Sequence, residues 1–155
     1  MALREDINNA LKQAMRDRAA DRLSTLRLIM AAIKDRDIAA RGEGEDTSGV
    51  ADGEILSILA KMVKQRQESA RTYEEGGRLD LAERELSEIT IIEEFLPKQL
   101  NEDEITEAVK VAVAEVGAES IRDMGKVMGA LKSKYTGQMD FGKVGPMVKD
   151  TLSGG

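Results

Sequence analysis

The sequence predicts an all-α, multihelical fold, and three observations lead to it. Apolar residues recur at spacings of three and four through most of the 155 residues, as in helices with one buried face. No stretch alternates apolar and polar residues as a half-buried strand would. Glycine, proline and capping residues divide the periodic sequence into segments of helical length. We therefore expect a four-helix N-terminal subdomain, residues 1–96, followed by a smaller three-helix C-terminal subdomain, residues 97–155.

The first four helices are defined by periodicity and by their ends. Their predicted ranges are 2–19, 21–40, 52–75 and 78–95. A glycine- and acid-rich loop, residues 41–53, leads to the third helix, with Asp52 as its expected N-cap. Gly76 and Gly77 end this helix, and Pro97 ends the fourth because it disfavours helical geometry at the preceding residue. The predicted inner stripe of the fourth helix is Leu79, Ala82, Leu86, Ile89 and Ile92.

The last three helices begin after this proline. Asn101 and Glu104 have the spacing of a capping box at the start of the fifth helix, and Gly117 closes that helix. The two helices after it are predicted over residues 120–137 and from residues 143–145 onward. Pro146 sets the second start, because proline fits best in the first turn of a helix.

The composition excludes several classes of function. The chain has no cysteine, histidine or tryptophan, which excludes disulfides, thiolate nucleophiles, Ser-His-Asp and Cys-His triads and the usual zinc sites. We therefore expect no metal and no cofactor. No apolar run approaches the ~20 residues that span a membrane, and the N-terminus has no signal-peptide pattern. A cytoplasmic protein without a membrane partner is the expectation.

The charge is unevenly distributed. The net charge of −6 argues against binding polyanions with the whole surface, and no DNA partner is expected. Residues 74–107 carry 3 basic and 12 acidic residues, whereas residues 108–155 carry 7 basic and 5 acidic residues. The excess acid is therefore local, and a small basic patch in the last third is compatible with the sequence.

Three charged residues, Asp37, Arg66 and Glu93, lie on predicted apolar stripes. A buried guanidinium without a partner is very costly, so we predict a pair between Arg66 and either Asp37 or Glu93. The structural interpretation is an internal ion pair that fixes the register of the helices. The functional alternative is a catalytic carboxylate held by an arginine, but no nucleophile or second base accompanies it, which favours the structural interpretation.

The stretch 122–134, RDMGKVMGALKSK, combines two unlike faces on one predicted helix. Its apolar stripe is Met124, Val127, Met128 and Leu131. Gly125 and Gly129 fall on another flank, bordered by Arg122, Lys126 and Lys132. Each glycine costs roughly 0.5–1 kcal/mol relative to alanine inside a helix. Either another helix packs closely on the glycines, or they leave room for a phosphate backbone.

Three strings in this chain resemble a known family. KMVKQRQESARTYEEGGRLDLAERE, EEFLPKQLNEDEI and IRDMGKVMGALKSK resemble the YqeY family of small bacterial proteins over essentially the whole chain. That family is similar to the tail domain of the B subunit of tRNA-dependent amidotransferase (GatB), most clearly in the last third. The resemblance implies an all-α protein with an N-terminal helical subdomain and a smaller C-terminal one.

The resemblance also implies a function class. The amidotransferase tail helps to hold tRNA and does not carry the chemistry, so an RNA-handling module is implied more readily than an enzyme. One departure weakens this inference. Family members often read GRADGKLV after the lysines, whereas this chain reads GQMDFGKVGPMV, so Gln138 replaces a basic residue.

Three functions follow as hypotheses. The first is binding of tRNA or another RNA through its backbone. The expected contacts are Arg122, Gly125, Lys126, Gly129 and Lys132, with Lys134 and Lys143 beside them. The second is an adaptor that binds an amidotransferase or another translation-related protein. The third is carbon–nitrogen ligase activity with glutamine as amido donor, which we regard as a label inherited from the amidotransferase, and we expect no catalytic residues.

Overall fold

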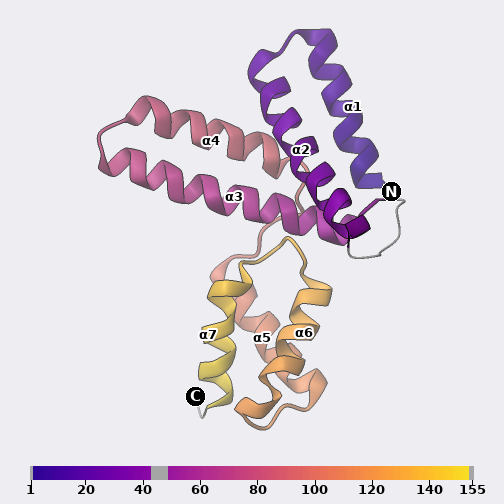
Figure 1. Ribbon diagram of the computed structural model, residues 1–155. Coiled ribbons are helices and arrows are strands. Elements are labelled where there is room, and N and C mark those ends of the chain that lie inside the picture. Colours follow the sequence, from indigo (N-terminus) through magenta and orange to yellow (C-terminus); the bar gives the residue numbers. More distant parts are fainter. Residues whose placement is uncertain (1, 43–48, 154–155) are drawn as a thin grey trace. The chain divides into compact units, whose positions relative to one another are not determined.

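The computed structural model describes residues 2–42 and 49–153, which are helical apart from turns and short connections (Figure 1). Its helices are α1 (Ala2–Asp17), α2 (Ala20–Gly42), α3 (Asp52–Glu75), α4 (Leu79–Glu93), α5 (Glu102–Val116), α6 (Met124–Lys134) and α7 (Phe141–Leu152). A 3₁₀ turn, η1 (Ile121–Asp123), leads into α6. No strand occurs in the described ranges, so the predicted all-α fold is confirmed. Residues 43–48 of the predicted loop lie outside the described residues.

Contacts along the chain group it into two compact units, Met1–Leu96 with α1–α4 and Pro97–Gly155 with α5–α7. We call them the N-terminal unit and the C-terminal unit and describe each by itself. Their organisation as two subdomains stays a prediction.

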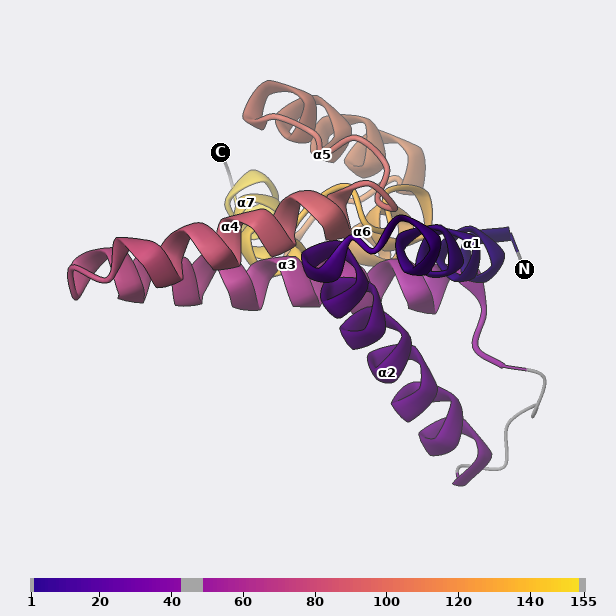
Figure 2. The same ribbon diagram turned by 90° about the horizontal axis from the view of Figure 1, so that it is seen from above.

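The N-terminal unit consists of two antiparallel hairpins, α1–α2 and α3–α4. The α3–α4 hairpin crosses the α1–α2 pair, and its turn end projects beyond that pair in both views (Figures 1 and 2). The core of the N-terminal unit contains side chains with no exposed surface from all four helices. They are Ile7, Leu26, Ile29, Ile33, Ile55, Leu59 and Ile92. Nearer the α3–α4 turn the buried residues are Ala70 and Ala82, whose small side chains let the two helices approach closely. Gly77 has a φ of 74° in this turn, as predicted for a glycine that ends α3.

The C-terminal unit packs three short helices around its own apolar core. The centre of the core is Val109, Val127, Leu131, Val144 and Val148. At the start of α5, the Asn101 side chain accepts a hydrogen bond from Glu104 N at 2.8 Å, and Glu104 accepts one from Asn101 N at 3.1 Å. The predicted capping box is thus confirmed. Gly117 ends α5 with a φ of 66°, also as predicted.

Two helices begin differently from the prediction. α3 starts with Asp52 in its first turn, and Ala51, which has no capping side chain, precedes it. α7 starts at Phe141, because the Asp140 side chain accepts a hydrogen bond from the backbone N–H two residues on and so caps the helix early. Pro146 therefore lies inside α7, where burial of this helix against the core compensates for the missing hydrogen bond.

The inner face of α4 is also rotated from the predicted stripe. Ala82, Ile89 and Ile92 are buried as predicted, but Leu79 is 63% exposed and Leu86 is 46% exposed. The side chains of Glu85 and Glu88 are half-buried instead. The centre of the buried face therefore lies on the opposite side of Ile89 from the two leucines.

Candidate nucleic-acid interface

α6 separates a buried apolar face from an open glycine face. Val127 and Leu131 are 0% and 1% exposed and belong to the core of the C-terminal unit. Gly125 and Gly129 are exposed, and a Cβ built on either glycine meets no atom within 4 Å. Neither α5 nor α7 therefore covers the glycines, so helix packing within the described residues does not explain them.

Basic residues border this open face. Arg122 in η1 and Lys126 and Lys132 in α6 are all exposed. At 100° per residue, the two lysines lie about 60° on either side of Gly129. Residues 121–134 contain four basic residues and one acidic residue, so this element is positive although the chain is acidic. We call Arg122, Gly125, Lys126, Gly129 and Lys132 the α6 strip.

The acidic residue in this element is Asp123, and its carboxylate is hydrogen-bonded to the backbone. It accepts a hydrogen bond from Glu119 N at 3.0 Å. This bond, with smaller contributions from the Ser120 backbone and the nearby Lys126, lowers the pKa of Asp123 below its usual value. Asp123 is therefore a fixed negative charge beside Arg122 at the N-terminal end of the α6 strip.

The remaining two predicted contacts lie apart from the strip. The Lys134 ammonium lies over the ring of Tyr135, 5.5 Å from its centroid, on a different flank of the helix from Gly129. Lys143 is exposed in the first turn of α7. The structure thus places five of the seven predicted residues on one face and the other two beyond it.

Gln138 has a structural task that the sequence did not reveal. Its side-chain amide donates a hydrogen bond to Lys98 O at 3.2 Å, and its backbone carbonyl accepts one from Leu100 N at 2.9 Å. The Gln99 amide donates to Gly137 O in the same region. Gln138 therefore ties the turn after α6 to the segment before α5. Where family members often have a basic residue, this chain has a glutamine whose side-chain amide contacts Lys98 O.

The predicted partner of Arg66 was wrong. Arg66 Nε lies 3.0 Å from Glu88 Oε2, and the two side chains are 15% and 17% exposed. The helical rotation described for α4 explains the error, because it brings Glu88 toward α3 and leaves Glu93 exposed. Arg66 also donates to Met62 O at 3.2 Å, so this pair joins α3 to α4 and has the geometry of a register-fixing contact.

Asp37 pairs instead with Arg4 of α1. The two Arg4 terminal nitrogens each lie 3.0 Å from one Asp37 oxygen, a bidentate arrangement. Arg4 also donates to Val50 O at 3.3 Å, and Val50 N donates to Asp37 at 2.9 Å. The Arg4 hydrogen bond is the main cause that lowers the pKa of Asp37. This network fastens the residues before α3 to α1 and α2.

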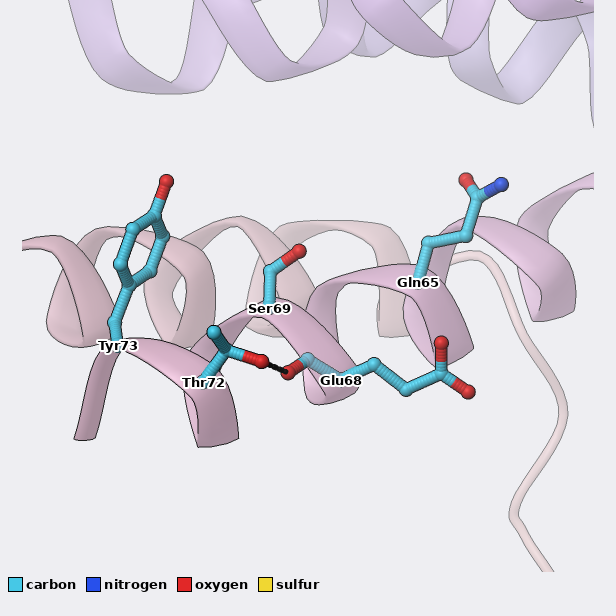
Figure 3. Close-up of a pocket in the computed structure, with 5 residues that line it drawn as sticks. All are labelled: Gln65, Glu68, Ser69, Thr72 and Tyr73. Carbon is cyan, nitrogen blue, oxygen red and sulfur yellow. Dashed lines mark hydrogen bonds between the residues drawn. The ribbon is translucent and has the colours of Figure 1, made fainter. Parts of the chain in front are cut away.

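Two surface hollows lie in the N-terminal unit, and neither carries a recognisable catalytic set. The first, of about 420 Å³, lies along one face of α3 and is lined by Gln65, Glu68, Ser69, Thr72 and Tyr73. Gln65, Ser69 and Tyr73 point to the same side there (Figure 3). The second, of about 490 Å³, lies between α2 and α4 and includes Asp21, Asp80, Glu83 and Glu88.

No three carboxylates in the described residues are close enough together to hold a metal ion. None of the helices in the described ranges is long and apolar enough to cross a bilayer.

Comparison of the sequence with known proteins shows the family to which the chain belongs. The fungal relatives called altered inheritance of mitochondria protein 41, mitochondrial, include one from Lachancea thermotolerans. It is 33% identical over 91 residues, which are 59% of this chain and 46% of that protein. One from Clavispora lusitaniae is 32% identical over 119 residues, 76% of this chain and 66% of that protein. The matched region thus spans about half to two thirds of these relatives.

A family model covers more of the chain than these relatives do. The model for YqeY, described as Yqey-like protein, matches residues 4–152, which include all of α2–α7 and all of α1 except its first two residues. The resemblance inferred from the three sequence strings is therefore confirmed, and the chain belongs to the YqeY family.

Proposed function

We propose that the protein binds the phosphate backbone of a structured RNA, with tRNA as the first candidate, through the α6 strip. The observation that carries the proposal is the open space above Gly125 and Gly129, on a helix face that basic residues border. A phosphate can approach the helix backbone more closely at glycine than at any other residue. Arginine and lysine at the edges supply the charge that backbone contacts require.

The chemistry of the strip favours recognition of shape and charge over base sequence. It contains no aromatic side chain and no Asn or Gln that could read a base edge. The glutamine-dependent ligase is not part of the proposal, since neither of the two hollows carries a recognisable catalytic set. We propose the cytoplasm as the compartment, and the names of the fungal relatives make the mitochondrion the alternative.

Titration of the full chain with labelled bulk tRNA tests the proposal. Three phosphate contacts predict a slope of about −2.7 for log affinity against log salt, or about 40-fold weaker binding at 200 mM than at 50 mM salt. Lys126→Glu with Lys132→Glu should remove most of the binding. The matched control is Lys110→Glu with Lys149→Glu, which makes the same charge change at exposed positions of α5 and α7.

Two outcomes would overturn the proposal. One is the absence of binding at low salt. The other is equal loss of affinity in the double variant and in a variant with two charge reversals outside the strip, Lys110→Glu with Lys149→Glu. Thermal unfolding of all variants should stay close to wild type, because all four lysines are exposed.

A further inference from the structure

The outer flank of α4 carries a regular stripe that nothing in the N-terminal unit covers. Leu79 and Leu86, 63% and 46% exposed, are seven residues apart and therefore lie on one line along the helix. Glu83, Thr90 and Glu93 fall on the same line and are exposed as well. We call Leu79, Glu83, Leu86, Thr90 and Glu93 the α4 seam; its members are spaced four, three, four and three residues apart.

This spacing is the one that receives another helix. Side chains at alternating intervals of three and four form the ridge that packs into the groove of a neighbouring helix. Single exposed leucines are ordinary, but two in register on a solvent-facing seam form an apolar contact line. The other flanks of α4 pack on α3 and α2, and Glu83, at the edge of the seam, also lines the hollow between α2 and α4. The seam is therefore the flank left for a further helix.

The charge of α4 selects the kind of helix. Residues 79–93 contain five acidic residues and one basic residue. Two of the acids have cationic partners, Glu88 with Arg66 and Asp80 with Arg78. Glu83 and Glu93, which lie in the seam, show no salt bridge within the described residues. A partner helix would therefore be favoured if it placed Lys or Arg beside them.

A second copy of the chain does not fit this seam well. Two α4 seams face to face would bring acidic residues against acidic residues. The basic α6 strip of another copy would match the charge, but its exposed face consists of glycines and cations and offers no apolar residue to the leucines. A partner needs both features on one helix.

We propose that the α4 seam binds a basic amphipathic helix of another protein, with the apolar residues of that helix on Leu79 and Leu86 and its cations beside Glu83 and Glu93. The proposal is independent of RNA binding, since it uses another helix in the other unit. Together the two surfaces would make the protein an adaptor between a partner protein and an RNA.

The test uses a labelled synthetic helix of about 18 residues with leucines at heptad spacing and lysines at the flanking positions. Its affinity for the full chain is measured by fluorescence anisotropy. Leu79→Ser with Leu86→Ser should weaken binding by at least about tenfold, because an apolar anchor pair supplies most of the energy of such a contact. Glu83→Gln with Glu93→Gln should weaken it less and reduce its salt dependence.

Controls separate this docking from general attraction to an acidic protein. Leu28→Ser removes a 44% exposed leucine from α2 and should leave the affinity unchanged. A peptide of the same composition with scrambled leucines should bind at least about tenfold more weakly. Equal binding of both peptides, an unchanged affinity in the leucine double variant, or self-association of the chain through the seam in sedimentation would each overturn the proposal.

Discussion

α4 and α6 have similar inner faces and different outer faces. Each buries an apolar stripe in the core of its own unit, through Ile92 in α4 and Val127 in α6, both 0% exposed. On its outer face α4 exposes leucines among acids, although leucine is stabilised by burial. On its outer face α6 exposes glycines among cations, although glycine destabilises a helix.

The contrast lies between residues that the core of each unit requires and residues that it does not. Core packing explains the inner residues of both helices, so those residues carry no further information. An exposed leucine lowers solubility and a glycine inside a helix lowers stability. No contact within the described residues offsets either effect. The opposite charges on the two faces are the basis of the two proposals, a basic helix for α4 and an RNA backbone for α6.

The largest expected effect separates the two faces of α4. Ile92→Ala should lower the free energy of unfolding by about 2–4 kcal/mol, because it opens a cavity in the core. Leu86→Ala on the same helix should change it by less than about 0.5 kcal/mol, because that side chain is 46% exposed. Urea unfolding of both variants measures the contrast. Equal destabilisation would mean that the outer face of α4 is not free.

The second effect concerns the contact that holds α4 to α3. Arg66→Met leaves the mostly buried Glu88 carboxylate without its cation, which should cost about 2 kcal/mol. Adding Glu88→Leu to this variant should restore part of the loss, since the unpaired charge is then gone. If urea unfolding shows that the two changes are simply additive, the pair does not couple α3 to α4.

A smaller effect sharpens the contrast on α6. Gly129→Ala should raise the free energy of unfolding by about 0.5–1 kcal/mol, because alanine favours the helix and its methyl group meets open space. The same change should weaken tRNA binding several-fold, because the methyl group stands where a phosphate would approach. Unchanged binding in the stabilised variant would mean that the cations of the strip bind the RNA without the glycines.

The smallest effect is the pH dependence that Asp37 gives to the N-terminal unit. Arg4 keeps the pKa of Asp37 below its value in the unfolded chain, about 3.9. Asp37 therefore stabilises the fold above about pH 4, and this stability is lost as the pH falls through the lower folded pKa. Asp37→Asn should be less stable than wild type near neutral pH, and the two should converge in acid. Asp35→Asn, an exposed change on α2, is the matched control.

The sequence predicted local features well because their causes are local. The capping box at Asn101 and the glycine ends of α3 and α5 depend on neighbouring residues alone. Two features were not predictable in the same way. The rotation of α4 follows from how α2 and α3 pack on it, and the partner of Arg66 follows from that rotation. Periodicity gives the direction of a buried stripe only approximately. For this reason Glu93 was predicted in place of Glu88 as the partner of Arg66.

The most direct test of the division between the two helices is a map of the backbone amides of the full chain by NMR, with and without tRNA. Shifts should concentrate on η1 and α6, with Gly125 and Gly129 among the largest, and should fade as salt is raised. The amides of α4 should stay unchanged at the same RNA concentration. Shifts centred on α4, or spread evenly over both units, would contradict the assignment of RNA to the α6 strip.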